Sequence, residues 1–108
     1  MTRKNIIYWL GLVCCILAGP LVAEDKVITQ KDKTFSAPEI TVKIGESVVF
    51  KNDDDVNHNV YSTTKGNEFN LKTQAPGASA SVPFKAEGRV EVSCAFHPKM
   101  KMTVHVKK

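Results

Sequence analysis

Repeated short alternations of apolar and polar residues, each followed by turn-forming residues, leave few folds open to this chain. The alternating segments cover residues 40–44, 47–51, 58–62, 81–84, 89–94 and 102–106. Groups such as Gly45-Glu46 and Ala86-Glu87-Gly88 separate them. A period of two is typical of strands buried on one face, and no apolar period of 3.6 residues persists after residue 23. The pattern predicts an all-β domain, either an antiparallel sandwich or a barrel.

The N-terminal segment has a different character and is predicted to be a signal peptide. Arg3 and Lys4 precede an apolar run that begins at Ile6, and the segment ends in the small residue Ala23. A membrane anchor is the alternative, but residues 6–23 are at the short end for a span and Gly19-Pro20 interrupt them. We therefore expect residues 1–23 to be removed, residues 24–108 to form one exported, periplasmic domain, and no stable membrane insertion after cleavage.

Removal of this segment changes the charge and the cysteine count. Lys plus Arg falls from 15 by the two residues Arg3 and Lys4 to 13, Asp plus Glu stays at 11, and the net charge of +4 becomes +2. Such a mildly basic domain gives no indication of nucleic-acid binding. Of three cysteines only Cys94 remains. An exported domain with a single thiol has no internal disulfide, so Cys94 is expected to be buried or bound.

The alternation also predicts where Cys94 points. In the segment 89–94, Val90, Val92 and Cys94 share one face, which is the apolar face. Cys94 is the last residue of that segment, so its thiol is expected in the core but only one loop away from solvent.

The residues after Cys94 include further soft metal ligands. His97 follows three residues later, and Met100 and Met102 follow His97. Two histidines, one thiolate and a weak axial methionine are the ligands of electron-transfer copper sites. Met100 is the preferred axial candidate because it lies in the turn, whereas Met102 fits as the first inward residue of the last strand; Met102 stays a second candidate.

The second histidine must come from elsewhere in the chain. His105 alternates with Val104 and Val106 in the last predicted strand and is expected to face outward. His58 is therefore the candidate. It follows the loop residues Asp53-Asp54-Asp55, which are predicted to be solvated.

These motifs together resemble those of the cupredoxins, the type 1 blue copper proteins. In that family a strand like residues 48–52 is followed by a loop and His-Asn-Val, here His58-Asn59-Val60, and then by Cys-x-x-His, here Cys94 and His97. The similarity covers about residues 42–106. It is greatest to amicyanin, in which Pro follows the second His and Met stands three residues after it, as Pro98 and Met100 do here.

Two positions depart from the amicyanin pattern. Phe96 stands where the family commonly has proline. Met102 stands five residues after His97, the spacing that the related pseudoazurin and plastocyanin use for their axial ligand.

The resemblance implies a cupredoxin-like Greek-key β-sandwich of about seven to eight short strands. It implies one copper ion held by His58, Cys94, His97 and Met100, with Asn59 linking the two ligand loops. Electrons would cross near His97, within an apolar patch. Redox proteins such as a dehydrogenase, a c-type cytochrome or an oxidase would be the partners, and the protein itself is expected to be a monomer.

The same residues are compatible with functions other than electron transfer. An enzyme is not expected, because all four copper positions are filled by protein side chains and no open position remains for a substrate. A copper carrier or storage protein would use the same ligands without redox cycling and is the main alternative. A metal-free binding module is a third possibility.

Overall fold

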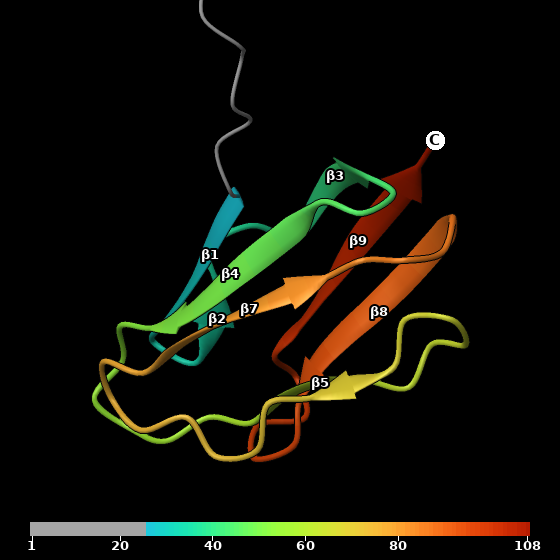
Figure 1. The fold of residues 1–108 in the computed structure, drawn as a ribbon. Helices are drawn as coiled ribbons and strands as arrows, with labels where there is room; N and C mark the ends of the chain where they lie inside the picture. The colour runs from blue at the N-terminus through green and yellow to red at the C-terminus, as the bar shows by residue number, and fades with distance from the viewer. Residues whose placement is uncertain (1–25) are drawn as a thin grey trace, which may run out of the picture.

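A computed structural model describes residues 26–108, which form nine β-strands and no helix. The strands are β1 (Lys26–Lys31), β2 (Thr34–Phe35), β3 (Glu39–Lys43), β4 (Ser47–Asn52), β5 (Val60–Ser62), β6 (Phe69–Asn70), β7 (Ser79–Pro83), β8 (Gly88–Cys94) and β9 (Lys101–Lys107). One sheet has the order β2-β1-β4-β7 and the other β3-β9-β8-β5-β6 (Figure 1). The all-β sandwich expected from the alternation is confirmed. The predicted signal peptide, residues 1–23, lies outside the described residues.

Both sheets are mixed, which corrects the expectation of a purely antiparallel sandwich. β1 runs parallel to β4, and β3 runs parallel to β9, whereas the other neighbours are antiparallel. The parallel pair of β3 and β9 follows from a crossover. After β2 has returned along β1, residues 36–38 carry the chain from the first sheet to the second, where β3 begins beside β9. Residues 26–108 contain no helix that could span a membrane.

The core lies between the two sheets and is built by the alternating residues. Val48 and Phe50 of β4 and Val90 and Val92 of β8 are fully buried, and Cys94 is 2% exposed. The ring of Phe50 stacks on that of Phe69, with 5.9 Å between their centroids. The inward direction predicted for Cys94 is therefore confirmed.

Three strands were not anticipated from the sequence, and one begins later than expected. The short strands β2 and β6 have only two residues each, too few for an alternation to be recognised, and β1 includes the buried polar residue Gln30. The strand expected from residue 58 starts at Val60. His58 instead forms an isolated antiparallel bridge with Gln74.

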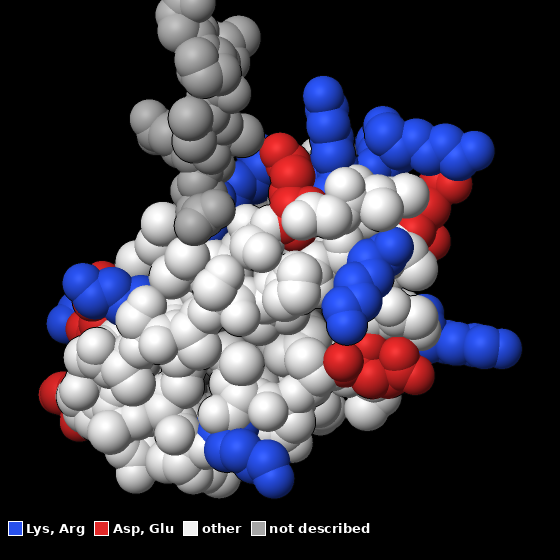
Figure 2. All heavy atoms as spheres, viewed as in Figure 1, with Lys and Arg blue, Asp and Glu red and all other residues white. Residues whose placement is uncertain are grey.

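The candidate ligands gather at one end of the sandwich. Cys94 ends β8 opposite Val60, which begins β5. This end of β8 lies at the bottom of Figure 1, away from the C-terminus of the chain. The lower part of the face in Figure 2 is mostly uncharged, and charged side chains gather toward its upper right.

Candidate metal centre

The loop that carries three of the candidate ligands is closed at its base by the backbone. The N–H of Cys94 donates to the carbonyl of Met100 at 3.1 Å, and the N–H of Met100 donates to the carbonyl of His97 at 2.9 Å. Cys94 is the last residue of β8 and Met100 directly precedes β9. The loop is therefore held at both ends by an antiparallel strand pair, which brings all three side chains to the same end of the core.

His58 lies beside Cys94, although 36 positions separate them in the sequence. Its side chain is fully buried, and its Nδ1 lies 3.7 Å from Cys94 Sγ. Its other nitrogen, Nε2, lies 2.9 Å from Asp54 Oδ2. Because a carboxylate accepts hydrogen bonds, the ring donates through Nε2, and Nδ1 is the nitrogen that faces the sulfur; a histidine that binds a metal through one nitrogen commonly donates to a carboxylate through the other.

The 3.7 Å separation between Nδ1 and Sγ fits one shared ion. Zinc bonds to these two kinds of donor are about 2.0 and 2.3 Å long, and with bonds of that size the angle at the metal is about 120°. That angle belongs to a trigonal plane, the geometry of His₂Cys copper sites. The pair thus has the spacing that two of three equatorial ligands need.

Asn59 joins the two ligand segments, as the resemblance implied. Its backbone N–H donates to Cys94 Sγ at 3.3 Å, and its carbonyl accepts from the N–H of Ala95 at 3.0 Å. Its side chain in turn donates to Asn70 Oδ1 and to the carbonyl of Lys72, both at 2.8 Å. A hydrogen bond to the sulfur fixes the direction in which it can bind a metal.

Asp54 is buried, which corrects the expectation that residues 53–55 form a solvated loop. It is 8% exposed, and its carboxylate accepts from the backbone N–H of Lys33 at 2.8 Å as well as from His58. These hydrogen bonds, that from Lys33 first and that from His58 second, hold the pKa of the Asp54 carboxyl well below its ordinary value. The motifs in the sequence did not single out Asp54. Its one signal was the spacing of four residues between Asp54 and His58.

His97 supplies the third candidate donor. Its ring centroid lies 4.9 Å from that of His58, and its Nε2 is buried without a hydrogen-bond partner. Buried polar atoms nearly always have partners, so an unpaired ring nitrogen beside a second histidine fits a metal ligand. Within residues 26–108, no three side chains from His, Cys, Asp and Glu form a complete metal-binding group. A site here therefore depends on His97 turning its ring toward Cys94 and His58.

Both axial candidates are buried, each 2% exposed. Met102 is the second residue of β9 and pairs with Val92, as a core residue does. Met100 precedes the strand and lines an open groove together with His97. Its closeness to His97 at the end of the core favours Met100.

The surface around His97 is apolar and edged by lysines. The groove has a volume of about 430 Å³ and is lined by Lys33, His97, Pro98, Lys99 and Met100. Phe96, next to His97, is 49% exposed. His105, by contrast, pairs with Glu39 of β3 at 2.6 Å and takes no part in this centre, as its predicted outward direction implied.

Comparison with known proteins finds related sequences. The family model of copper binding proteins of the plastocyanin/azurin family matches residues 23–107. The methylamine utilization protein MauL of Methylorubrum extorquens is 31% identical over 90 residues, which cover 82% of this chain and 79% of that protein.

Solved cupredoxins have the same fold. A purple cupredoxin from Nitrosopumilus maritimus is 25% identical with a TM-score of 0.69 and covers 77% of this chain and all of its own. The reduced state of a proline-to-phenylalanine variant of amicyanin is 29% identical, also with a TM-score of 0.69, over 80% of this chain and 86% of that one.

Proposed function

Because this chain belongs to the plastocyanin/azurin family of copper-binding proteins, we propose that it carries single electrons between redox proteins. It holds one copper ion through His58, Cys94, His97 and Met100. The observation that carries the proposal is the buried pair of Cys94 Sγ and His58 Nδ1, 3.7 Å apart, with the N–H of Asn59 directed at the sulfur. Copper bound there supplies a one-electron couple.

The protein's part in electron transfer is to keep the ligands still. The backbone holds Cys94 through Met100, and Asp54 orients the ring of His58. Cys94 and His58 are therefore in place before the metal binds, and ligands that keep one geometry in both oxidation states have little to rearrange when an electron moves. All four ligands come from the chain, which supports a carrier over an enzyme.

The surface around His97 is the proposed point of contact with partners. Phe96 and Pro98 are exposed apolar residues next to a ligand, and Lys33 and Lys99 line the groove beside them. A partner that presents carboxylates around an apolar centre would complement this surface. The partners we propose are a dehydrogenase, a c-type cytochrome or an oxidase, bound through the small and transient interface typical of redox encounters. The protein acts as an exported, periplasmic monomer.

Copper loading tests the proposal. Protein loaded with Cu(II) should show intense visible absorption from charge transfer between thiolate and copper, and voltammetry should show a reversible one-electron couple. Colourless protein after loading would refute the copper site. A coloured protein without a reversible couple that hands its copper rapidly to an apo-protein would point instead to the copper carrier or storage role.

A further inference from the structure

One residue outside the ligand set holds the backbone of His58. The N–H of His58 donates to the carbonyl of Gln74 at 3.0 Å, and the N–H of Gln74 donates to the carbonyl of His58 at 2.7 Å. This bridge is isolated from the strands of either sheet. The position of His58 before β5 therefore depends on where Gln74 is held.

Gln74 is itself held by its side chain and not by a strand. It is 3% exposed and lies between β6 and β7. Its Oε1 accepts from Gln30 Nε2 at 2.9 Å, and its Nε2 donates to the carbonyl of Phe50 at 3.1 Å. Gln30 belongs to β1 and Phe50 to β4, so the side chain of Gln74 connects His58 to the sheet opposite Cys94.

Asn52 connects the same sheet to the loop before His58. Its Nδ2 donates to the carbonyls of Gln74 and Val56, both at 2.9 Å. Its Oδ1 accepts from the N–H of Asp54, also at 2.9 Å. Asn52, the last residue of β4, thus holds both Gln74, which bonds to the backbone of His58, and Asp54, whose carboxylate orients the His58 ring.

The buried amides that hold His58 cost the core free energy. Gln30, Asn52 and Gln74 are almost fully buried, and Gln30 Oε1 has no hydrogen-bond partner. Burying an amide costs free energy even when most of its hydrogen bonds are made, and apolar side chains of similar size are often at least as stabilising. A role in placing His58 accounts for polar residues at these positions.

We propose that Gln74 is a positioning residue for the copper ligand His58, and that Gln30 and Asn52 keep Gln74 in place. The proposal rests on the proposed function, since it concerns the same copper site. In the copper-free protein the cluster holds His58 beside Cys94, so that binding the metal or changing its oxidation state does not require the loop to move.

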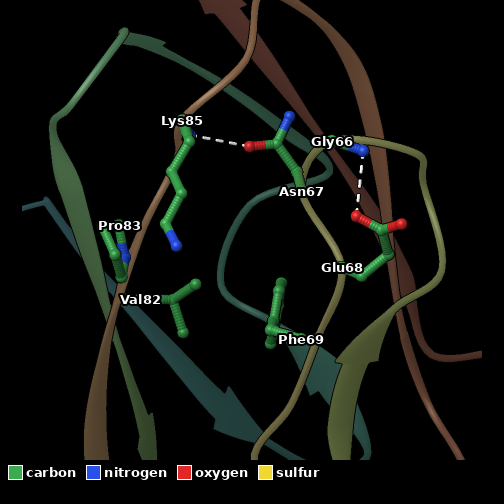
Figure 3. A pocket seen from close by; sticks show the side chains of 7 residues that line it. All are labelled: Gly66, Asn67, Glu68, Phe69, Val82, Pro83 and Lys85. Atoms are coloured by element: carbon green, nitrogen blue, oxygen red, sulfur yellow. Dashed lines mark hydrogen bonds between the residues drawn. The ribbon is translucent and has the colours of Figure 1, made fainter.

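Truncation of two buried amides provides the test. Gln74→Ala removes the side-chain anchor of His58. Asn67→Ala is the matched control, because Asn67 is also a buried amide that holds a loop. It accepts from the N–H of Lys85 at 2.8 Å (Figure 3) and donates to the carbonyl of Ala86 at 2.9 Å. Both contacts lie before β8, whose seven residues place Cys94 about 20 Å away at its other end.

We expect Gln74→Ala to weaken copper binding by about 10-fold to 100-fold, as the loss of an outer partner of a metal ligand commonly does. Its Cu(II) absorption spectrum and midpoint potential should differ from those of the wild type. In the copper-free protein, hydrogen exchange at the His58 amide should accelerate more than at the amides of β9. Asn67→Ala should lower stability but leave the copper affinity, the spectrum and the potential unchanged.

Wild-type affinity, spectrum and potential in Gln74→Ala would overturn the proposal, and so would an equal loss of copper affinity in Asn67→Ala. If Gln74→Ala does not fold, Gln30→Leu decides the matter by the same measurements, since it removes one anchor of Gln74 and leaves the bond to Phe50. A failure of the proposed function would be distinct, because the wild type itself would then lack the coloured one-electron site.

Discussion

His58 and Asp54 form a buried pair in which Nε2 of the ring lies 2.9 Å from Oδ2 of the carboxylate. The carboxylate also accepts the backbone N–H of Lys33, in the turn between β1 and β2, and Lys33 lines the groove beside His97. One carboxylate thus contacts both a proposed copper ligand and the turn that borders the proposed partner surface. This geometry leads to a prediction about the reduction potential.

Replacing Asp54 by Asn should raise the midpoint potential of the copper site. The amide oxygen can still accept from His58, but the negative charge that favours Cu(II) over Cu(I) is gone. The rise should be on the order of tens of millivolts, where about 59 mV is a tenfold change for one electron. Voltammetry measures it. Asp53→Asn is the control, because Asp53 is exposed and paired with Lys51, and it should shift the potential much less.

Substituting each methionine in turn identifies the axial ligand. Met100→Leu should leave copper bound but raise the potential and alter the absorption spectrum, because a long axial bond tunes the metal more than it holds it. Met102→Leu should keep both properties and cost less than about 1.5 kcal/mol of stability, as swaps of similar volume in a core do. The reverse result would assign the axial position to Met102.

The visible colour should depend on Cys94 and not on His105. Cys94→Ser should abolish the intense absorption even if some copper stays bound, because the band needs a thiolate. His105→Gln should retain the full colour, since His105 pairs with Glu39 away from the site. Absorption spectra of both copper-loaded variants check this, and persistent colour in Cys94→Ser would remove Cys94 from the ligand set.

The lysine beside the groove should steer acidic partners. Lys99→Glu should slow association with an acidic redox partner by about tenfold at low ionic strength, and the difference from wild type should shrink as salt is added. Lys107→Glu makes the same change of charge near the end of β9, far from His97, and should have little effect. Stopped-flow electron transfer measured over a range of salt concentrations compares the two. Equal effects of both variants would mean that only the net charge matters.

Processing of the N-terminus can be checked directly. Protein recovered from the periplasm should begin near Glu24, because the apolar run ends at the small residue Ala23. Intact mass spectrometry of the periplasmic and membrane fractions measures this. Retention of residues 1–23 in the membrane fraction would instead show a tethered protein.

Local patterns in the sequence were enough to predict which face of each strand is buried and which candidate ligands share the loop that follows β8. Side chains alternate along any strand, so the inward direction of Cys94 followed from Val90 and Val92 alone. His97 and Met100 lie within six residues of Cys94, and a single turn brings such residues together. For these features the deciding contacts lie close in the sequence.

The sequence named His58 as a candidate, but only the tertiary structure showed how distant residues come together at the site. The pairing of Val60 with Cys94 places His58 beside the thiol, and strand pairing between segments more than thirty residues apart leaves no local signal. An aspartate in an acidic loop is expected at the surface. Asp54 is buried nonetheless, because hydrogen bonds from Lys33 and His58 make its burial favourable. Gln74 has no strand pattern around it. Its role emerges only when β1 and β4 pack across the core from His58, because the free energy of a buried amide depends on partners that folding brings to it.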